Sequence, residues 1–205
     1  MAELTSDQTK SREKPLRAFI AIKLPDDVIE FLGQIQSSLK KDGLDIKEIK
    51  WVRPESIHLT LKFLGDINPS EIDALGAAIK TAAKALGPLT LSATGLGAFP
   101  SVKRPRVLWS GVGGDLEVLG RLHARLDEAL SVLGMEKENK RFKAHLTLAR
   151  IKGSVRPEVI VDAVSRYGNQ ASRGFAADRI YLINSELKPG GPQYSDLLCA
   201  PMGID

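Results

Sequence analysis

The sequence has a single cysteine, three histidines and no long apolar segment. The one thiol, Cys199, excludes an intramolecular disulfide and a zinc site built from several cysteines. No run approaches the roughly 18 apolar residues that a membrane-spanning helix needs. Residues 1–14 are polar and charged and lack the apolar segment of a secretory signal. We therefore expect a cytoplasmic protein with no membrane partner.

The composition is ordinary for a soluble globular protein, and the net charge of +4 is only mildly basic. That balance allows a polyanionic partner such as RNA, but it equally fits a solvated basic surface. The basic residues gather in two parts of the chain: Lys103, Arg104 and Arg106, and then Lys137, Lys140, Arg141, Lys143 and Arg150.

Strand-like and helix-like segments are mixed along the whole chain. Several neighbouring strands are joined by connections too short for a helical crossover, which favours antiparallel pairing and an α+β fold. We predict a disordered tail at 1–14 and a single domain at 15–205. The predicted strands are 17–22, 50–52, 57–64, 89–96, 107–112, 142–151, 180–187 and 194–199, and the predicted helices are 25–39, 68–86, 116–133 and 157–167.

The most informative feature is a repeated tetrapeptide: His58-Leu59-Thr60-Leu61 returns as His145-Leu146-Thr147-Leu148. With average composition, three matching residues after a given pair of histidines are expected on the order of once in a thousand. The repeat therefore indicates an internal duplication, with one motif in each half of the chain. The third histidine, His123, has no repeated context and is interpreted as a surface or boundary residue.

The spacing within each motif suits acid–base chemistry. Alternate side chains of a strand share a face, so the histidine and threonine point one way while the leucines point into the core. Two such pairs supply two groups that titrate near neutrality and two neutral hydroxyl donors. One imidazole can activate water while the other protonates the leaving oxygen of a phosphate ester, and a cyclic phosphate suits this set because its ring is strained. The predicted catalytic residues are His58, His145, Thr60 and Thr147.

No metal is predicted at this site. Divalent phosphoesterase centres combine carboxylates with histidines, and neither motif has an Asp or Glu in register.

With both motifs in view, the sequence resembles the two-histidine (2H) phosphoesterase superfamily, and within it the RNA 2′,3′-cyclic phosphodiesterases, historically called 2′-5′ RNA ligases. That family carries two His-x-Thr-x motifs, and the likeness covers nearly the whole chain beyond the tail. One departure is Ala144, where many relatives have proline. The segments that carry the resemblance are 17–21, 51–52, 56–65, 97–100, 106–109, 142–150, 185–187 and 191–194.

The resemblance implies a bilobal fold in which two pseudo-twofold-related antiparallel β-sheets, with helices on their outer faces, flank a central active-site cleft. It implies hydrolysis of RNA 2′,3′-cyclic phosphate to a 2′-phosphate end without a cofactor, with His58 as proton donor and His145 as proton acceptor. The implied partners are RNA 3′ ends, including tRNA halves, which some relatives also join through a 2′-5′ linkage. We expect a monomer.

Two basic residues near the motifs are predicted to bind the substrate. Arg150 matches the arginine with which the family holds phosphate, although strict alternation puts it on the face opposite His145 unless the strand bulges. By the same alternation, Lys62 shares the face of His58 and Thr60. It is expected either to contact the RNA backbone or to be a solvated strand-end lysine.

Among the aromatic residues, Tyr194 is the predicted substrate-binding residue, because it follows a Gly-Pro turn and could stack on a terminal base. Phe63 and Phe142 lie in apolar strands and are expected in the core.

Two other functions remain open from the sequence. The substrate could be a small cyclic nucleotide, such as ADP-ribose 1″,2″-cyclic phosphate, or a 2′-5′ oligonucleotide; the preferred length of substrate would separate these from an RNA end. A non-catalytic RNA-end binding module would keep the fold without turnover, but it would not need two titrating imidazoles.

Overall fold

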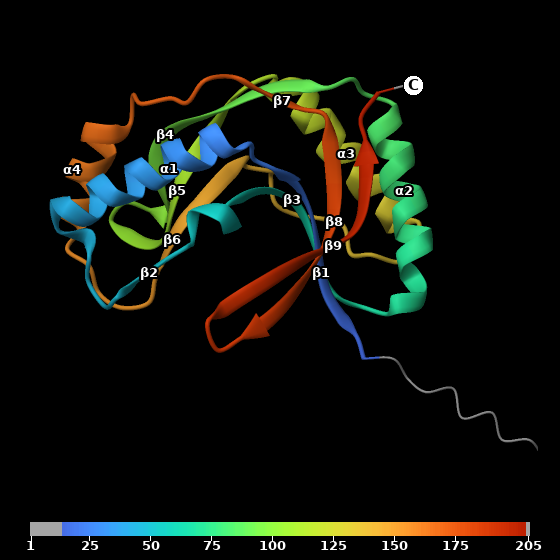
Figure 1. Cartoon of the computed structure of the whole chain (residues 1–205), viewed down its shortest axis with the longest axis horizontal. Coiled ribbons are helices and arrows are strands. Elements are labelled where there is room, and N and C mark those ends of the chain that lie inside the picture. Colours follow the sequence, from blue (N-terminus) through green and yellow to red (C-terminus); the bar gives the residue numbers. More distant parts are fainter. Residues whose placement is uncertain (1–13, 204–205) are drawn as a thin grey trace, which may run out of the picture.

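The computed structural model describes residues 14–203, so the predicted disordered tail lies outside the described residues except for Lys14. Within that range, nine strands and four α-helices are mixed along the chain, which confirms the predicted α+β class (Figure 1). None of these helices is long and apolar enough to cross a membrane. The strands are β1 (Leu16–Lys23), β2 (Ile49–Trp51), β3 (His58–Ile67), β4 (Leu89–Ser101), β5 (Arg104–Gly114), β6 (His145–Ile151), β7 (Phe175–Ala177), β8 (Arg179–Lys188) and β9 (Gly191–Pro201). The helices are α1 (Asp26–Leu39), α2 (Ile72–Lys84), α3 (Leu116–Ser131) and α4 (Pro157–Tyr167), and the short helical turns are η1 (Lys40–Leu44), η2 (Pro54–Ser56) and η3 (Pro69–Glu71).

The largest difference from the predicted elements is the long hairpin of β4 and β5. Both strands extend beyond their predicted ends and pair from Leu91↔Gly114 to Ser101↔Arg104. The Trp109 ring lies so close to Gly97 that a Cβ there would overlap the ring. Glycine normally weakens a strand, but Gly97 is required here because the Trp109 side chain crosses β4 at this position. The strand β7 was not predicted, because three residues are too few for an alternation signal.

The strands of residues 14–203 form one strongly curled antiparallel sheet in the order β7-β4-β5-β6-β3-β1-β8-β9, with β2 paired to β6. The two predicted sheets are the two halves of this continuous sheet. The two halves of the sheet, β7-β4-β5-β6 and β3-β1-β8-β9, are joined between β3 and β6 at the pair Leu59↔Leu146. One continuous sheet therefore carries both motifs at its centre.

The junction itself displays the predicted pseudo-twofold relation. Leu59 and Leu146 occupy the same position in the two tetrapeptides, and two antiparallel strands that pair through equivalent residues are related by a local twofold axis. From this axis outward, β3-β1-β8-β9 matches β6-β5-β4-β7 in order.

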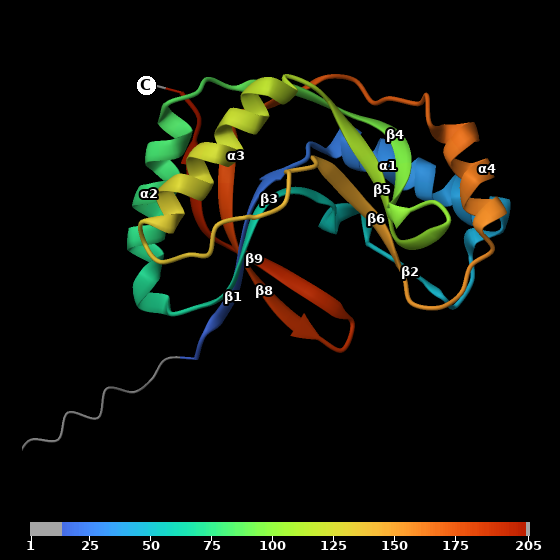
Figure 2. The same ribbon diagram turned by 180° about the vertical axis from the view of Figure 1, so that it is seen from behind.

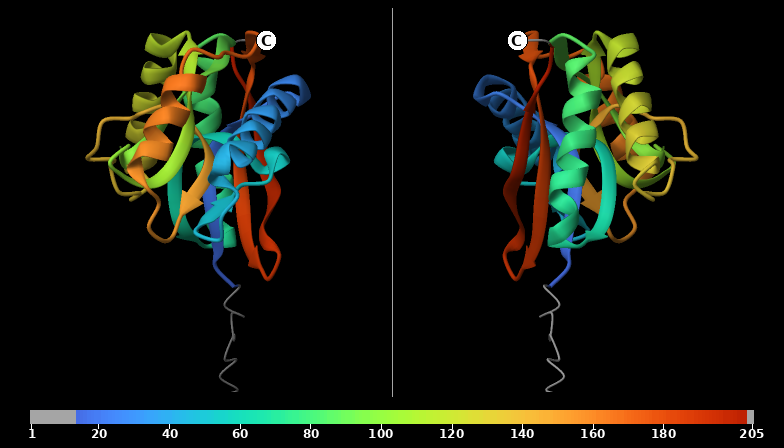
Figure 3. Two further views of the ribbon diagram at one scale, coloured as in Figure 1. Left: turned by 90° about the vertical axis from the view of Figure 1, so that its left-hand side faces the viewer. Right: turned by 90° about the vertical axis from the view of Figure 1, so that its right-hand side faces the viewer.

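The helices link the two halves. Helix α1 follows β1 but packs beside α4 on the half that contains β4, whereas α3 follows β5 but packs beside α2 and against β3 (Figures 1 and 2). The views from the two sides show α2 and α3 adjacent on one half of the sheet (Figure 3). Each half of the sheet is thus partly covered by a helix that follows a strand of the other half.

The main core lies between the helices and the sheet, and it includes Leu59 and Leu146 from the junction. We call the opposite side of the sheet the open face. A second, small cluster lies there, formed by Phe19, Ala21 and Ile183 with Tyr181 packed against them.

Candidate active site

Both motifs show the predicted alternation of faces. In β3 and in β6 the histidine and threonine are half-buried, and the two leucines of each motif are buried in the main core. The apolar contacts of the leucines anchor the strand, and the rigid sheet then holds the polar side chains on the open face.

The strand register brings the two motifs together. Because Leu59 pairs with Leu146, the antiparallel register sets His58 across from Thr147 and Thr60 across from His145. Two imidazoles and two hydroxyls therefore lie around the junction. Each half of the sheet contributes one imidazole and one hydroxyl.

Each imidazole is oriented by a main-chain carbonyl two residues upstream. The Nδ1 of His58 lies 2.9 Å from the oxygen of Ser56, and the Nδ1 of His145 lies 2.7 Å from the oxygen of Lys143. A carbonyl oxygen only accepts hydrogen bonds, so this contact assigns the proton to Nδ1 of each ring. The Nε2 atom of each ring is then the nitrogen that can accept a proton.

The two histidines differ in their surroundings. The His58 ring stacks on Phe19 at 4.6 Å between centroids and meets the edge of Tyr194 at 5.3 Å. The His145 ring meets Phe99 edge-on at 5.0 Å. The Lys143 ammonium lies 5.8 Å from the centre of that Phe99 ring. His58 is thus enclosed by aromatic rings, whereas His145 meets a single ring, that of Phe99, which itself has a cation over it.

This enclosure affects the proton affinity of His58. Burial lowers its pKa to about 4; the positive charge of Arg150 acts in the same direction, and the Ser56 carbonyl opposes both. Burial raises the pKa of Tyr194, against the charges of Arg150 and Arg53. Arg150 is therefore close enough to influence both rings.

A β-bulge follows the threonine in each motif strand. On β3, Thr60 pairs with Ala21 and Lys62 with Ile20, so Leu61 has no counterpart on β1. On β6, Thr147 pairs with Trp109 and Ala149 with Leu108, so Leu148 has no counterpart on β5. One additional residue reverses the alternation, so the side chains that follow it directly change face.

The bulges decide which residues reach the open face. Arg150 is exposed on the side of His145 and Thr147, so the bulge on which its assignment depended is present. Its counterpart in the other half is Phe63, which is 67% exposed with its ring 6.1 Å from that of Phe19. The prediction of a core Phe63 is therefore wrong, because the prediction took the alternation to be unbroken.

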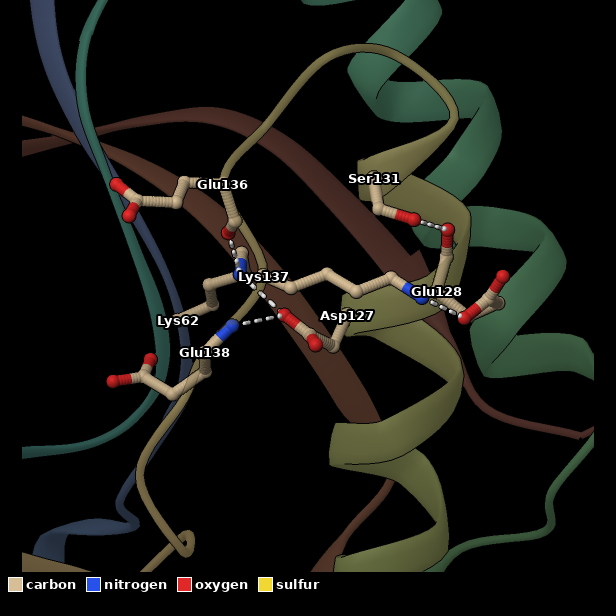
Figure 4. Close-up of polar contacts among 7 residues, drawn as sticks. All are labelled: Lys62, Asp127, Glu128, Ser131, Glu136, Lys137 and Glu138. Carbon is tan, nitrogen blue, oxygen red and sulfur yellow. Dashed lines mark hydrogen bonds and ion pairs between the residues drawn. The ribbon is translucent and has the colours of Figure 1, made fainter.

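The same bulge turns Lys62 into the protein. Its side chain is only 4% exposed, and its ammonium pairs with Asp127 of α3 and donates to the Glu136 carbonyl at 2.8 Å (Figure 4). Asp127 also accepts a hydrogen bond from the Glu138 amide at 3.2 Å. The prediction that Lys62 shares the face of His58 and contacts RNA is thus wrong, and the residue instead ties β3 to the segment that follows α3.

That segment is also held by an aromatic contact. Phe142 stacks on His123 of α3 at 4.2 Å and packs against the main core, as predicted for this phenylalanine. His123 is half-buried, in agreement with its interpretation as a boundary residue. The chain then enters β6 through Lys143, whose carbonyl orients His145.

Two further residues contact the elements that carry the site, and no sequence pattern indicated them. Arg53 is 57% exposed, donates to the Pro192 carbonyl in the β8–β9 hairpin at 3.3 Å, and lies 3.6 Å from Glu55. Gln36 of α1 is buried and bonds to the bulged residue of β6. Neither lies in a repeated motif, so only the folded chain reveals their position.

A hollow of about 470 Å³ is lined by Lys103, Pro157 and neighbours on α4, and neither motif histidine lines it. Both histidines are half-buried on the strongly curled sheet.

Comparison with known proteins agrees with this geometry. A family model described as LigT-like phosphoesterase matches residues 22–109 and 115–194. A protein of Archaeoglobus fulgidus named RNA 2′,3′-cyclic phosphodiesterase is 34% identical over 182 residues, which cover 89% of this chain and 98% of that protein. The protein of the same name from Aquifex aeolicus is 33% identical over 186 residues, with 89% and 95% covered.

Solved structures show the same fold. A crystal structure of a Thermus thermophilus protein matches with a TM-score of 0.72 at 27% identity, covering 93% of this chain and all of that one. Escherichia coli LigT in its apo form matches with a TM-score of 0.72 at 21% identity, covering 93% of this chain and 99% of the other.

The curled sheet and its two His-x-Thr strands define a two-histidine phosphoesterase. The chain belongs to the LigT-like phosphoesterase family.

The proton affinity of His58 provides a test of the site's electrostatics. We expect the His58 imidazole to titrate near pH 4 in the free protein, as followed by NMR of its ring protons. Arg150→Gln removes a positive charge, which favours the protonated ring, so the pKa should rise. The unfolded chain protonates His58 near pH 6.5, so this histidine's contribution to stability is complete above that pH and is lost as the pH falls towards 4.

The matched control is Arg166→Gln, which removes an exposed guanidinium that is paired with Asp42 on the helical side of the sheet. A His58 pKa that does not respond to Arg150→Gln, or that moves equally in both variants, would contradict the placement of Arg150.

The buried ion pair between Lys62 and Asp127 predicts unequal costs for removing its two partners. Asp127→Asn leaves an ammonium that is 4% exposed without its anion, and we expect a loss of about 3 kcal/mol. Lys62→Met leaves a carboxylate that is 17% exposed and still bonded to the Glu138 amide, so about 1–2 kcal/mol should be lost. Urea unfolding at neutral pH measures both; equal costs, or a larger cost for Lys62→Met, would contradict the arrangement.

Proposed function

We propose that this protein hydrolyses RNA 2′,3′-cyclic phosphate ends to 2′-phosphate ends without a metal, using His58 and His145 as its acid–base pair. The observation that carries the proposal is the junction pair Leu59↔Leu146, which gathers both His–Thr pairs on one face. The activity named for the relatives of Archaeoglobus fulgidus and Aquifex aeolicus supports the choice of substrate.

The chemistry follows from the two Nε2 atoms. In the assignment that the family resemblance implies, His145 Nε2 takes a proton from water as the water oxygen bonds to phosphorus. The bond between phosphorus and the 3′ oxygen breaks, and His58 Nε2 donates a proton to that oxygen. The product carries a 2′-phosphate and a 3′-hydroxyl, and proton exchange with solvent restores the two rings.

The remaining polar groups have a place in this scheme. Thr60 and Thr147 supply neutral hydroxyl donors to the non-bridging phosphate oxygens, and Arg150 supplies a guanidinium suited to bidentate binding of phosphate. Metal independence is supported by the donor groups: nowhere in residues 14–203 do three His, Cys, Asp or Glu side chains gather as metal ligands would.

The low pKa of His58 places a condition on its role. In the free protein the ring is neutral at pH 7, so it can act as a donor only when it gains a proton together with the anionic substrate. A bound phosphate supplies the negative charge that would raise the pKa of His58.

The pH profile tests the acid–base pair. We expect kcat/KM to follow a bell-shaped profile whose acidic limb lies near pH 4, because kcat/KM reports the free protein and the pair must carry one proton in all. Either assignment of donor and acceptor gives this shape, so the profile tests the pair rather than the order of the roles. A flat profile from pH 3 to 9 would contradict His58 and His145 as the acid–base pair.

The catalytic residues are tested with a short RNA that ends in a 2′,3′-cyclic phosphate, incubated in EDTA. We expect the wild type to form a 2′-phosphate end, and His58→Ala and His145→Ala each to lose at least about 100-fold in rate. His123→Gln, at the one other histidine, is the matched control and should remain active. Activity that disappears in EDTA, or that survives either alanine substitution, would sink the proposal.

The same open face supports an RNA end over a small cyclic nucleotide. Phe63 and Tyr194 present exposed aromatic rings near His58 on which a terminal base can stack, and both pack against the buried Phe19. Arg53 lies beyond Tyr194, at the β8–β9 hairpin, and its exposed guanidinium could bind the next phosphate of a polynucleotide.

Substrate length then separates the two classes of substrate. We expect Arg53→Gln to lower kcat/KM roughly tenfold on a dinucleotide with a cyclic phosphate end, and less than about threefold on a mononucleoside 2′,3′-cyclic phosphate. Lys143→Gln removes the cation over Phe99; a larger loss on the dinucleotide from this variant than from Arg53→Gln would place the next phosphate on the Phe99 side of the site. Equal losses on both substrates, or no preference of the wild type for the longer one, would favour a small cyclic nucleotide.

Tight binding of such RNA ends without product would favour a binding module. Ligation through a 2′-5′ linkage, tRNA halves as substrates, a cytoplasmic location and a monomeric state stay predictions.

A further inference from the structure

Gln36 is a buried polar side chain whose hydrogen bonds end at the motif strand. It lies on α1 among the apolar residues that face the core and is only 2% exposed. Its Nε2 atom donates to the carbonyl oxygens of Val52 at 2.8 Å and of Leu148 at 2.9 Å. A buried amide of this kind is retained only if its donors are satisfied, and here both are.

The acceptor at Leu148 is the bulged residue of β6. Leu148 has no counterpart on its β5 side, and on its other side its carbonyl accepts from the Val52 amide at 2.9 Å. Gln36 therefore bridges the carbonyls of two strands at the point where the alternation of β6 reverses. The bulge is what places Arg150 on the open face and leaves Ile151 in the core.

We infer that Gln36 is a positioning residue: its amide holds the bulge at Leu148 and thereby directs Arg150 towards the phosphate between the two histidines. The inference rests on the phosphate-binding role proposed above for Arg150.

The other half of the sheet contains a parallel arrangement. Helix α3 crosses to the half that it covers, as α1 does, and its Asp127 pairs with Lys62 next to the bulge at Leu61. In each half of the sheet, a polar side chain of the covering helix, Gln36 of α1 or Asp127 of α3, is thus bonded at or next to the bulge of the motif strand. The two bulges direct different groups to equivalent positions, a guanidinium at Arg150 and an aromatic ring at Phe63.

The test is a double-mutant cycle between Gln36 and Arg150, measured as kcat/KM on RNA with a cyclic phosphate end and as inhibition by inorganic phosphate. Gln36→Met keeps the length of the side chain but removes both donors. We expect it to lower kcat/KM about tenfold and to weaken phosphate inhibition. In an Arg150→Gln background, the same substitution should change kcat/KM less than about twofold, because the group that it positions is already absent.

Gln34→Met is the matched control, since Gln34 lies two residues earlier on α1, is exposed and contacts Glu30 of its own helix. It should change neither reading. Gln36→Asn retains an amide on a shorter side chain that cannot reach both carbonyls, and we expect a partial loss; this variant also serves if Gln36→Met does not fold.

The outcomes separate this inference from the proposed function. An inactive wild type overturns the function itself. Two results with an active wild type would overturn the positioning role, because the two residues would then act independently. In the first, Gln36→Met lowers kcat/KM by the same factor in the wild-type and Arg150→Gln backgrounds. In the second, Gln36→Met leaves kcat/KM unchanged although Arg150→Gln lowers it.

Discussion

One additional residue after the threonine of each motif strand determines which side chains can reach the substrate. Without these bulges, β6 would direct Arg150 into the apolar core and expose Ile151, and β3 would direct Phe63 into the core. A guanidinium cannot be buried there without a partner, so the fold and the site depend on the same local feature. The bulges lie next to the two His–Thr pairs, as bulges often do where a strand must redirect a side chain.

The second constraint is the close contact of the two halves at Leu59 and Leu146. A duplicated motif is useful only if its copies meet, and the local twofold axis at this pair brings two imidazoles together from residues far apart in the chain. The duplication also leaves the halves free to differ. His58 is enclosed by aromatic rings and has a low pKa, whereas His145 meets only the Phe99 ring, over which the Lys143 cation lies. That difference suits a reaction that needs one acid and one base.

Much of the site could be predicted from the sequence because it lies in a repeat. The tetrapeptides indicate His58, Thr60, His145 and Thr147 directly, and period-two alternation gives their common face. The α+β class follows from the mixture of strands and helices. Arg150 could be assigned only on the condition of a bulge, because alternation by itself cannot reveal one.

The errors arise from contacts between residues that are distant in sequence. The burial of Lys62 depends on Asp127, 65 residues away, and the bond from Gln36 to Leu148 spans 112 residues. Periodicity describes one strand at a time, so it could reveal neither the polar groups that hold the bulges nor the exposed Phe63. The joining of two expected sheets into one depends on a single residue pair, which no local pattern encodes.

The most direct test of the site is a crystal structure of the protein with a nucleotide 2′-phosphate, the product class of the proposed reaction. We expect the phosphate to lie between the Nε2 atoms of His58 and His145, with hydrogen bonds from Thr60 and Thr147 and with Arg150 directed to it from the bulged strand. A phosphate bound away from the junction of β3 and β6, or an Arg150 that turns from it into the core, would contradict the arrangement described.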